Sequence, residues 1–313
     1  VGQKWLGVCF ALFGSLAAFG IGNMVQANTT AEALTQVVGL NRYAGGGILA
    51  FLAGLVILGG IKRIAEVASI LVPAMVVLYF GGAAAIILIH AAQIPAGLVL
   101  IFKQAFTGTA ATGGFAGAMV ADTLRYGIAR GLFSNESGLG SAPIAAAAAR
   151  TNQPAKQALV SMTGTFLDTI VVCSFTGLVL AATQAWTSGE TGVTLTIRAF
   201  SDGLPGDWGK WIVTMGVITF AFSTILGWSY YGEKCFEYLA GTRYVHHYRY
   251  LWIGFVFLGA VFKLDLVWNF SDVMNALMAI PNLIGLIYLS GTLVRETETF
   301  EQGVKDGSIH PYD

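Results

Sequence analysis

Charged residues and cysteines are scarce in this sequence, and each scarcity argues against a class of protein. Its 313 residues include only 17 Lys and Arg and 17 Asp and Glu, or 11%, where a soluble protein would carry about 25%. The net charge is zero and no basic cluster occurs, so nothing indicates a nucleic-acid partner. The three cysteines show neither a disulfide framework nor metal-ligand spacing and are interpreted as small apolar residues.

Signatures of catalysis are also lacking. The sequence shows no His and Cys set at metal-ligand spacing, no phosphate-binding glycine loop and no nucleophile beside a base. The four histidines lie at the ends of apolar segments or in loops, where they are expected to be solvated. The sequence therefore predicts neither an enzyme nor a protein with a resident cofactor.

Apolar sequence is abundant: 55% of the residues are hydrophobic, and the mean hydropathy is +0.69. Apolar windows of about 18 residues or more recur, which is the length that crosses a bilayer. We therefore expect an all-α, polytopic membrane protein with one transmembrane domain over residues 1–313. Its eight predicted spans are 5–27, 45–61, 67–90, 118–149 (broken), 157–182, 210–232, 248–268 and 272–293.

The positive charges predict an orientation for these spans. If the spans alternate, ten Lys and Arg fall on one side and five on the other, with Arg125 and Arg130 inside the membrane. The side richer in positive charge is expected to be cytoplasmic. Both ends of the chain are then cytoplasmic, with residues 294–313 forming a solvated tail. The loop 184–209, which holds Pro205 and several glycines, is expected to be extracellular and irregular.

One polar run, GLFSNESGLGSAPIAAAAAR at 131–150, interrupts the fourth span. Unpaired backbone groups at membrane depth are tolerated only where they are buried in protein or line a cavity, so the run predicts a binding site. Helices over 119–133 and 140–149, with a break at 134–139, together cover one bilayer crossing. Ser141 and Pro143 are typical of the start of the second half-helix. The alternative is that 105–130 is the span and 131–153 a cytoplasmic loop.

Two other spans carry polar residues with open interpretations. In the first span, Asn23 and Gln26 are spaced to share a helix face, and Gly22 allows close approach; they line a ligand or only bond other helices. In the sixth span, Ser223 and Thr224 either bind sodium or bond the carbonyl one turn back. Trp228, one turn beyond Thr224, either walls a ligand or packs.

Ionisable residues at membrane depth are the remaining candidates. Asp168 lies near the middle of the fifth span, where an ionised carboxylate is costly unless it is paired. Ion coupling, gating and a structural pair with an arginine all remain open for it. Glu136 in the break is a candidate ligand or a brace for the unwound backbone, and Arg130 is a candidate gate or carboxylate-binding group.

Three long segments together resemble one family. They are GLFSNESGLGSAPIAAAAAR (131–150), QALVSMTGTFLDTIVVCS (157–174) and FAFSTILGWSYYGE (220–233). Weaker matches, GNMVQANT, GGIKRIAEVA and DVMNALMAIPNLIGLI, occur in the expected order. The whole chain resembles the alanine/glycine:cation symporter family of prokaryotic sodium-coupled amino-acid transporters.

The resemblance implies a leucine-transporter-type fold of inverted five-helix repeats, in which broken helices bind sodium and a small amino acid. The eight spans would be core helices three to ten, with the first two core helices missing from this chain. The function implied is sodium-coupled symport of alanine or glycine across the cell (inner) membrane by alternating access. Proton coupling through Asp168 or Glu136 stays an alternative, and a channel or a membrane scaffold is less favoured.

The resemblance also implies roles for single residues, with sodium as co-substrate and no cofactor. Ser223 and Thr224 would be the sodium ligands, and it implies no role for Asp168. The residues expected to bind or line the amino acid are Gly22, Asn23, Gln26, Phe133, Ser134, Asn135 and Trp228.

Overall fold

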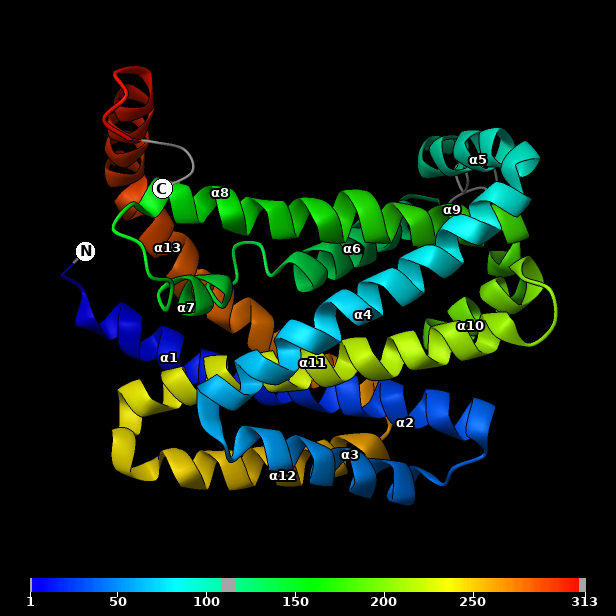
Figure 1. Cartoon of the computed structure of the whole chain (residues 1–313), viewed down its shortest axis with the longest axis horizontal. Coiled ribbons are helices and arrows are strands. Elements are labelled where there is room, and N and C mark those ends of the chain that lie inside the picture. Colours follow the sequence, from blue (N-terminus) through cyan, green and yellow to red (C-terminus); the bar gives the residue numbers. More distant parts are fainter. Residues whose placement is uncertain (1, 108–115, 310–313) are drawn as a thin grey trace.

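The structure is a computed structural model that describes residues 2–107 and 116–309, and the regular elements in these ranges are helices. In chain order they are α1 Lys4–Ala18, η1 Phe19–Met24, α2 Val25–Val38, α3 Arg42–Ile57, α4 Gly60–Ile89, η2 Ala91–Gln93, α5 Ile94–Thr107, α6 Ala116–Asn135, α7 Ala142–Ala146, α8 Pro154–Thr165, η4 Phe166–Cys173, α9 Ser174–Thr183, η5 Ala185–Ser188, α10 Gly192–Gly203, α11 Trp208–Ala240, η6 Thr242–Tyr244, α12 Val245–Val261 and α13 Leu264–Lys305. Most of the long helices run along one axis of the molecule (Figure 1).

Five helices in the described part of the chain are long and apolar enough to cross a membrane: Lys4–Val38, Gly60–Ile89, Pro154–Thr183, Trp208–Ala240 and Asp265–Lys305. Arg42–Ile57 and Ala91–Lys103 are shorter apolar helices. Each of the eight predicted spans coincides with a helix or helix pair, although α3 and α12 are short. The all-helical, polytopic architecture is therefore confirmed, whereas the count of eight spans stays a prediction.

The first span is the centre of the bundle. Elements α1, η1 and α2 form one continuous helix, and 67% of its apolar window is buried, against 11% for the window in α13. It packs against α11, α12 and α13, which come from the other end of the sequence. Apolar residues from these helices form the main core around Trp252, which is fully buried.

Two spans contain π-helical segments. Phe19–Met24 lies between α1 and α2, and Phe166–Cys173 lies between α8 and α9. A π-helical turn accommodates an extra residue and occurs often at functional sites. The first segment is almost entirely buried, and it contacts α11, α12 and α13.

The segment between residues 184 and 209 is more ordered than predicted. It contains a short helical turn, η5, and the helix α10, which packs on α2, α4, α9 and α11. The expectation of an irregular loop was therefore wrong. Val193, Ala199 and Phe200 are buried at helical spacing, so their apolar contacts stabilise a helix that Pro205 and the glycines at its ends only delimit.

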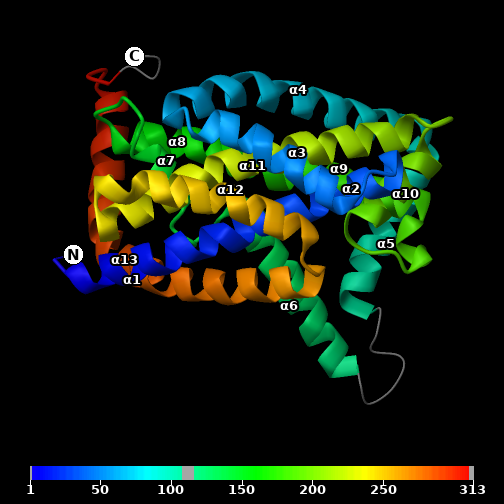
Figure 2. The same ribbon diagram turned by 90° about the horizontal axis from the view of Figure 1, so that it is seen from below.

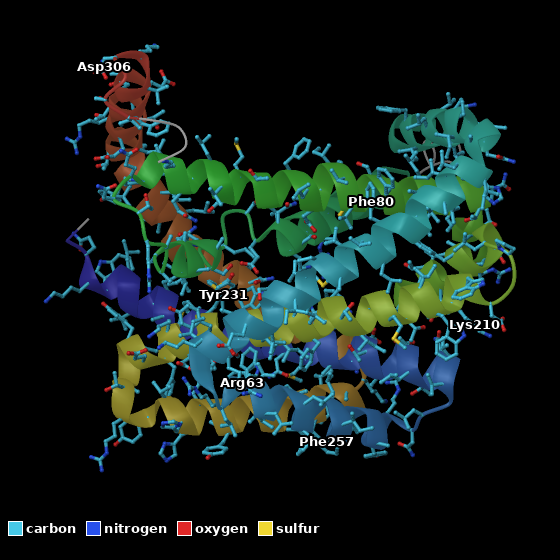
Figure 3. The ribbon with its side chains drawn as sticks, in the orientation of Figure 1. Arg63, Phe80, Lys210, Tyr231, Phe257 and Asp306 are labelled. Carbon is cyan, nitrogen blue, oxygen red and sulfur yellow. The ribbon has the colours of Figure 1, made fainter. Side chains whose placement is uncertain are left out.

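Helix α13 extends past the predicted boundary at residue 293 and ends at Lys305. Its last part, coloured red, turns away from the long axis in both views and lies across the end of the bundle that carries both termini (Figures 1 and 2). Figure 3 shows Asp306 at the tip of this arm, while Lys210, at the start of α11, lies at the opposite end. Residues 294–305 are thus helical, and their cytoplasmic placement stays a prediction.

Candidate functional site

The fourth span is broken two residues later than the sequence predicts, at 136–141 instead of 134–139. Helix α6 ends at Asn135, and the chain turns through Glu136, Gly138 and Gly140, which all have positive φ, before α7 begins. The second half-helix is shorter than expected. Regular α-helix covers Ala142–Ala146 only, because the amides of Ala148 and Ala149 then bond carbonyls three residues back and tighten the final turn.

Ser141 has a different role from the predicted one. It occupies the N-cap position of α7, but its hydroxyl makes no capping hydrogen bond and instead donates to Glu136 Oε2 at 2.7 Å. The indole of Trp228 lies beside the same carboxylate. Tyr231 lies near the same carboxylate and packs on the Trp228 ring. Figure 3 shows Tyr231 on α11, which contacts α7. The carboxylate therefore joins the break to α11.

Trp228 is fixed against the first span by Gly22. A Cβ atom placed on Gly22 would lie 2.0 Å from Trp228 Cβ, so only glycine permits this approach of η1 and α11. Trp228 is 4% exposed. Gly22, Trp228 and Glu136 thus form a continuous contact from the central span to the break.

The last residues of α6 are tied to the π-helical segment η4. Ser134 Oγ donates to Asp168 Oδ2 at 2.6 Å, and Asn135 Nδ2 donates to Thr169 Oγ1 and to the carbonyl of Gly131. Asn135 Oδ1 is buried without a partner. Asp168 therefore accepts from a hydroxyl, whereas the sequence suggested an arginine as its partner. This cluster presents several oxygen atoms at the edge of the break.

Arg130 pairs with a residue that sequence reasoning did not select. Its Nη2 donates to Asp272 Oδ2 at 2.7 Å, which joins α6 to α13. The guanidinium lies 4.0 Å from the centroid of the Trp268 ring, and Phe133 packs on the same indole. Phe133 is therefore part of an aromatic and ionic contact between α6 and α13, one turn above the break.

Asn23 and Gln26 have separate partners. Asn23 is fully buried, and its Nδ2 donates to the carbonyl of Trp252 in α12 at 2.8 Å. Gln26 is partly exposed and donates to the carbonyl of Ile21 in its own span. The prediction of a shared face assumed α-helical periodicity, which η1 does not keep. Asn28, not selected from the sequence, donates to two carbonyls at the end of α12.

Ser223 and Thr224 lie in the unbroken helix α11. Both hydroxyls donate to the carbonyl of Phe220 at 2.9 Å, and Ser223 also contacts Met75 Sδ. This is the local bonding that sequence reasoning named as the alternative to a sodium site. Each oxygen keeps a lone pair that a cation can use. Within the described ranges, no group of three His, Cys, Asp or Glu could hold a metal ion.

The residues from helix α13 were not foreseen. Asn282 Nδ2 donates to the carbonyl of Gly138 at 2.9 Å, and Ser271 and Asn275 are buried on the same helix. The available signal was a set of polar residues at helical spacing in an otherwise apolar span. Together, the break offers two carboxylates, hydroxyls, amides and positive-φ backbone beside a tryptophan, an arrangement suited to binding a small polar or ionic solute and unsuited to covalent catalysis.

Long apolar helices, together with a partly buried polar break between two helices, are typical of a membrane transport protein. Comparison with known proteins agrees: residues 1–312 match the model of the sodium:alanine symporter family. The chain belongs to this family, whose members are transporters and not enzymes.

Individual relatives support the same assignment. The chain is 51% identical to the sodium/alanine symporter AgcS of Methanococcus maripaludis over 96% of its own length and 66% of that protein. It is 49% identical to an uncharacterized transporter of Haemophilus influenzae, over 100% of the chain and 68% of the relative. A third relative, described as a probable sodium/glutamine symporter, GlnT of Bacillus subtilis, is 36% identical over 97% of the chain and 63% of its own length. The chain thus spans about two thirds of the length of these relatives.

Proposed function

We propose that the full-length protein carries out sodium-coupled symport of a small neutral amino acid, alanine or glycine, by alternating access in a leucine-transporter-type fold of inverted repeats. The observation that carries the proposal is the partly buried break at 136–141, in which Leu139, Gly140 and Ser141 are buried and Ser141 bonds Glu136, in a chain that belongs to the sodium:alanine symporter family. Half-helices that meet at membrane depth offer dipole ends and free backbone groups to an amino acid and a cation.

The substrate would bind at the end of α6, against α11. Ser134 and Asn135 carry polar atoms at the break, and Trp228 closes the wall formed with Gly22. Phe133 faces the Trp268 ring, which leaves it one turn from this wall. Asn23 and Gln26 would line the site from the side of the first span. Because their side-chain amides donate to carbonyls of the protein, they would hold the backbone around η1 in place.

Ser223 and Thr224 would be sodium ligands, with lone pairs of their hydroxyl oxygens coordinating the cation while the O–H groups donate to the Phe220 carbonyl. Arg130 and Asp272 would form a gate that opens when α6 and α13 separate. Asp168 and Glu136 would couple ion binding to the geometry of the break through Ser134 and Ser141.

Proton coupling is the second candidate, and Glu136 favours it. Its carboxyl group lies in the break of a span, where it accepts from the Ser141 hydroxyl, and an ionisable group at membrane depth can carry a proton. Uptake measured against pH at fixed sodium separates the two candidates. Loss of the pH dependence in Glu136→Gln with uptake retained would favour proton coupling.

We further propose a multi-pass protein of the cell (inner) membrane with both ends of this chain in the cytoplasm. Exposed Trp186 and Trp208 lie near the end of the bundle that carries α10, and exposed Trp5 and Tyr238 lie near the other, as expected for two aromatic belts. The side predicted to be cytoplasmic carries ten Lys and Arg, against five on the other side.

Uptake of radiolabelled alanine by the full-length protein in proteoliposomes tests the proposal. We expect uptake that needs an inward sodium gradient, that glycine inhibits and that falls in Asn135→Ala and Thr224→Ala. Thr219→Ala is the matched control, because Thr219 is also back-bonded on α11. Competition by unlabelled glutamine tests whether this protein shares the substrate for which GlnT is named. Uptake that is unchanged without sodium and in both variants would refute the proposal.

A further inference from the structure

The break needs a hydrogen-bond donor from outside its own span. Because α6 stops at Asn135, the carbonyls that follow have lost the amides that a continuing helix would supply. The amide of Leu139 bonds the carbonyl of Glu136 at 3.2 Å. For the carbonyl of Gly138, the donor is the side chain of Asn282, at 2.9 Å. A side chain of α13 therefore supplies a bond that secondary structure does not.

Asn282 is closely enclosed by the break. A Cβ atom on Gly140 would lie 2.8 Å from Asn282 Oδ1 and 2.6 Å from Phe10 Cε2, and Gly140 also has a φ of +87°. A Cβ on Gly138, at φ +74°, would touch Leu283. Space beside Asn282 and the positive φ thus both require glycine at 140, whereas at 138 the positive φ alone favours it.

The local sequence of α13 explains why this side chain is available. Pro281 lies inside the helix and lacks an amide proton, so it removes one helical hydrogen bond and favours a bend. Ser271, Met278 and Asn282 recur at helical spacing along one face, and this face contacts Gly20 of η1 and Gly14 of α1 before it reaches the break. The same face of α13 therefore contacts both the central span and the broken span.

We propose that Asn282 is a positioning residue of the transport site, which holds the break in its binding conformation by donating to the Gly138 carbonyl. The inference rests on the proposed function and names a residue that acts through the backbone rather than on the solute. With this donor in place, Glu136 and the end of α6 keep a fixed geometry, so substrate and sodium bind without first ordering the segment. Movement of α13 is thereby linked to the shape of the site.

The test compares three variants of the full-length protein in proteoliposomes. Asn282→Ala removes the side chain, and Asn282→Asp keeps its shape but replaces the donor with an acceptor. Ser271→Ala is the matched control, because it removes a buried hydroxyl from the same helix face, and this hydroxyl donates to the Val267 carbonyl of its own helix. We expect the alanine KM and the half-saturating sodium concentration to rise about five- to tenfold in Asn282→Ala, as for loss of one hydrogen bond.

In Asn282→Asp, both constants should rise at least as much, because a carboxylate oxygen faces the Gly138 carbonyl. Maximal uptake per folded transporter should change less than KM, and Ser271→Ala should match the wild type. An Asn282→Asp variant with wild-type KM would overturn the proposal, since it would assign the residue to packing alone. Unchanged KM in Asn282→Ala would overturn it as well.

A second measurement does not depend on transport. In a background without Cys9, Cys173 and Cys235, Leu139→Cys places a thiol at a position that is 5% exposed inside the break. We expect a membrane-permeant maleimide to label it several-fold faster in Asn282→Asp than with Asn282 or in Ser271→Ala. Equal labelling rates would overturn the positioning role. Wild-type protein without sodium-dependent uptake would instead refute the proposed function, and the labelling result would still decide the role of Asn282.

Discussion

Gly22 provides the sharpest test of the contact between the central span and α11. In Gly22→Ala, the new methyl group would lie 2.0 Å from Trp228 Cβ and 2.2 Å from Cγ, far inside the 3.4 Å at which ordinary contact begins. Trp228 cannot rotate freely to relieve this overlap, because its side chain is buried and its ring packs on Tyr231. The variant must therefore push η1 and α11 apart.

Overpacking of this kind costs about 1–3 kcal/mol, which corresponds to about five- to 150-fold in an equilibrium constant. We expect the alanine KM of Gly22→Ala to rise by a factor in this range, because Trp228 also moves away from Glu136. The matched control is Gly227→Ala, since a Cβ on Gly227, the residue before Trp228, would meet open space. KM is measured from initial rates of uptake in proteoliposomes, alongside thermal unfolding in detergent.

The reasoning would be refuted by a Gly22→Ala variant whose KM and stability match those of Gly227→Ala. A double-mutant cycle with Trp228→Ala gives an independent check. If the overlap is the cause, the effect of Gly22→Ala should largely disappear when the indole is absent, so the two changes should not add. Additive effects would show that Gly22 acts through something other than Trp228.

Three further predictions concern charges and hydroxyls. Glu233→Gln should lower the free energy of unfolding by about 3–5 kcal/mol, because it breaks the bidentate pair of Glu233 and Arg249, two side chains that are 11% and 14% exposed. The control Glu237→Gln breaks a more exposed pair and should lower it by less than about 1 kcal/mol. Equal melting curves of the two variants would contradict this prediction. Asp272→Asn should slow uptake several-fold, and Arg130→Asp with Asp272→Arg should restore part of it; no rescue would remove the ion pair from the gate. Thr224→Ala should raise the half-saturating sodium concentration about tenfold or more with little change in melting temperature, whereas an effect equal to that of Thr219→Ala would exclude a sodium ligand.

The sequence permitted prediction of the helical membrane architecture and of the break, because both depend on local patterns. Long apolar windows predict spans. Continuing a helix through the glycines at 138 and 140, close to Ser134 and Glu136, would cost conformational free energy. The helix α10 was missed for the opposite reason. Its flanking proline and glycines received more weight than the buried spacing of Val193, Ala199 and Phe200.

Partners across the bundle could not be predicted in the same way. Asp168 bonds Ser134, and Arg130 bonds Asp272, across sequence separations of 34 and 142 residues. No local pattern selects between such pairings. Asn23 bonds a carbonyl of α12 because the π-helical segment changes which residues share a helix face. This could not be predicted, since π-helices have no clear sequence signature.

The π-helical segment at residues 19–24 also determines which residues of the first span face each neighbouring helix. One extra residue in a turn rotates everything after it about the helix axis, so the half before the segment and the half after it present different faces to their neighbours. Deleting one residue there would preserve a continuous apolar helix of nearly the same length and hydropathy. It would nevertheless turn Asn28 away from the end of α12, where its amide bonds two carbonyls. In this span, the helical register rather than the composition determines which residues contact α12. A one-residue gap here in an alignment of two relatives would therefore indicate that different side chains make this contact.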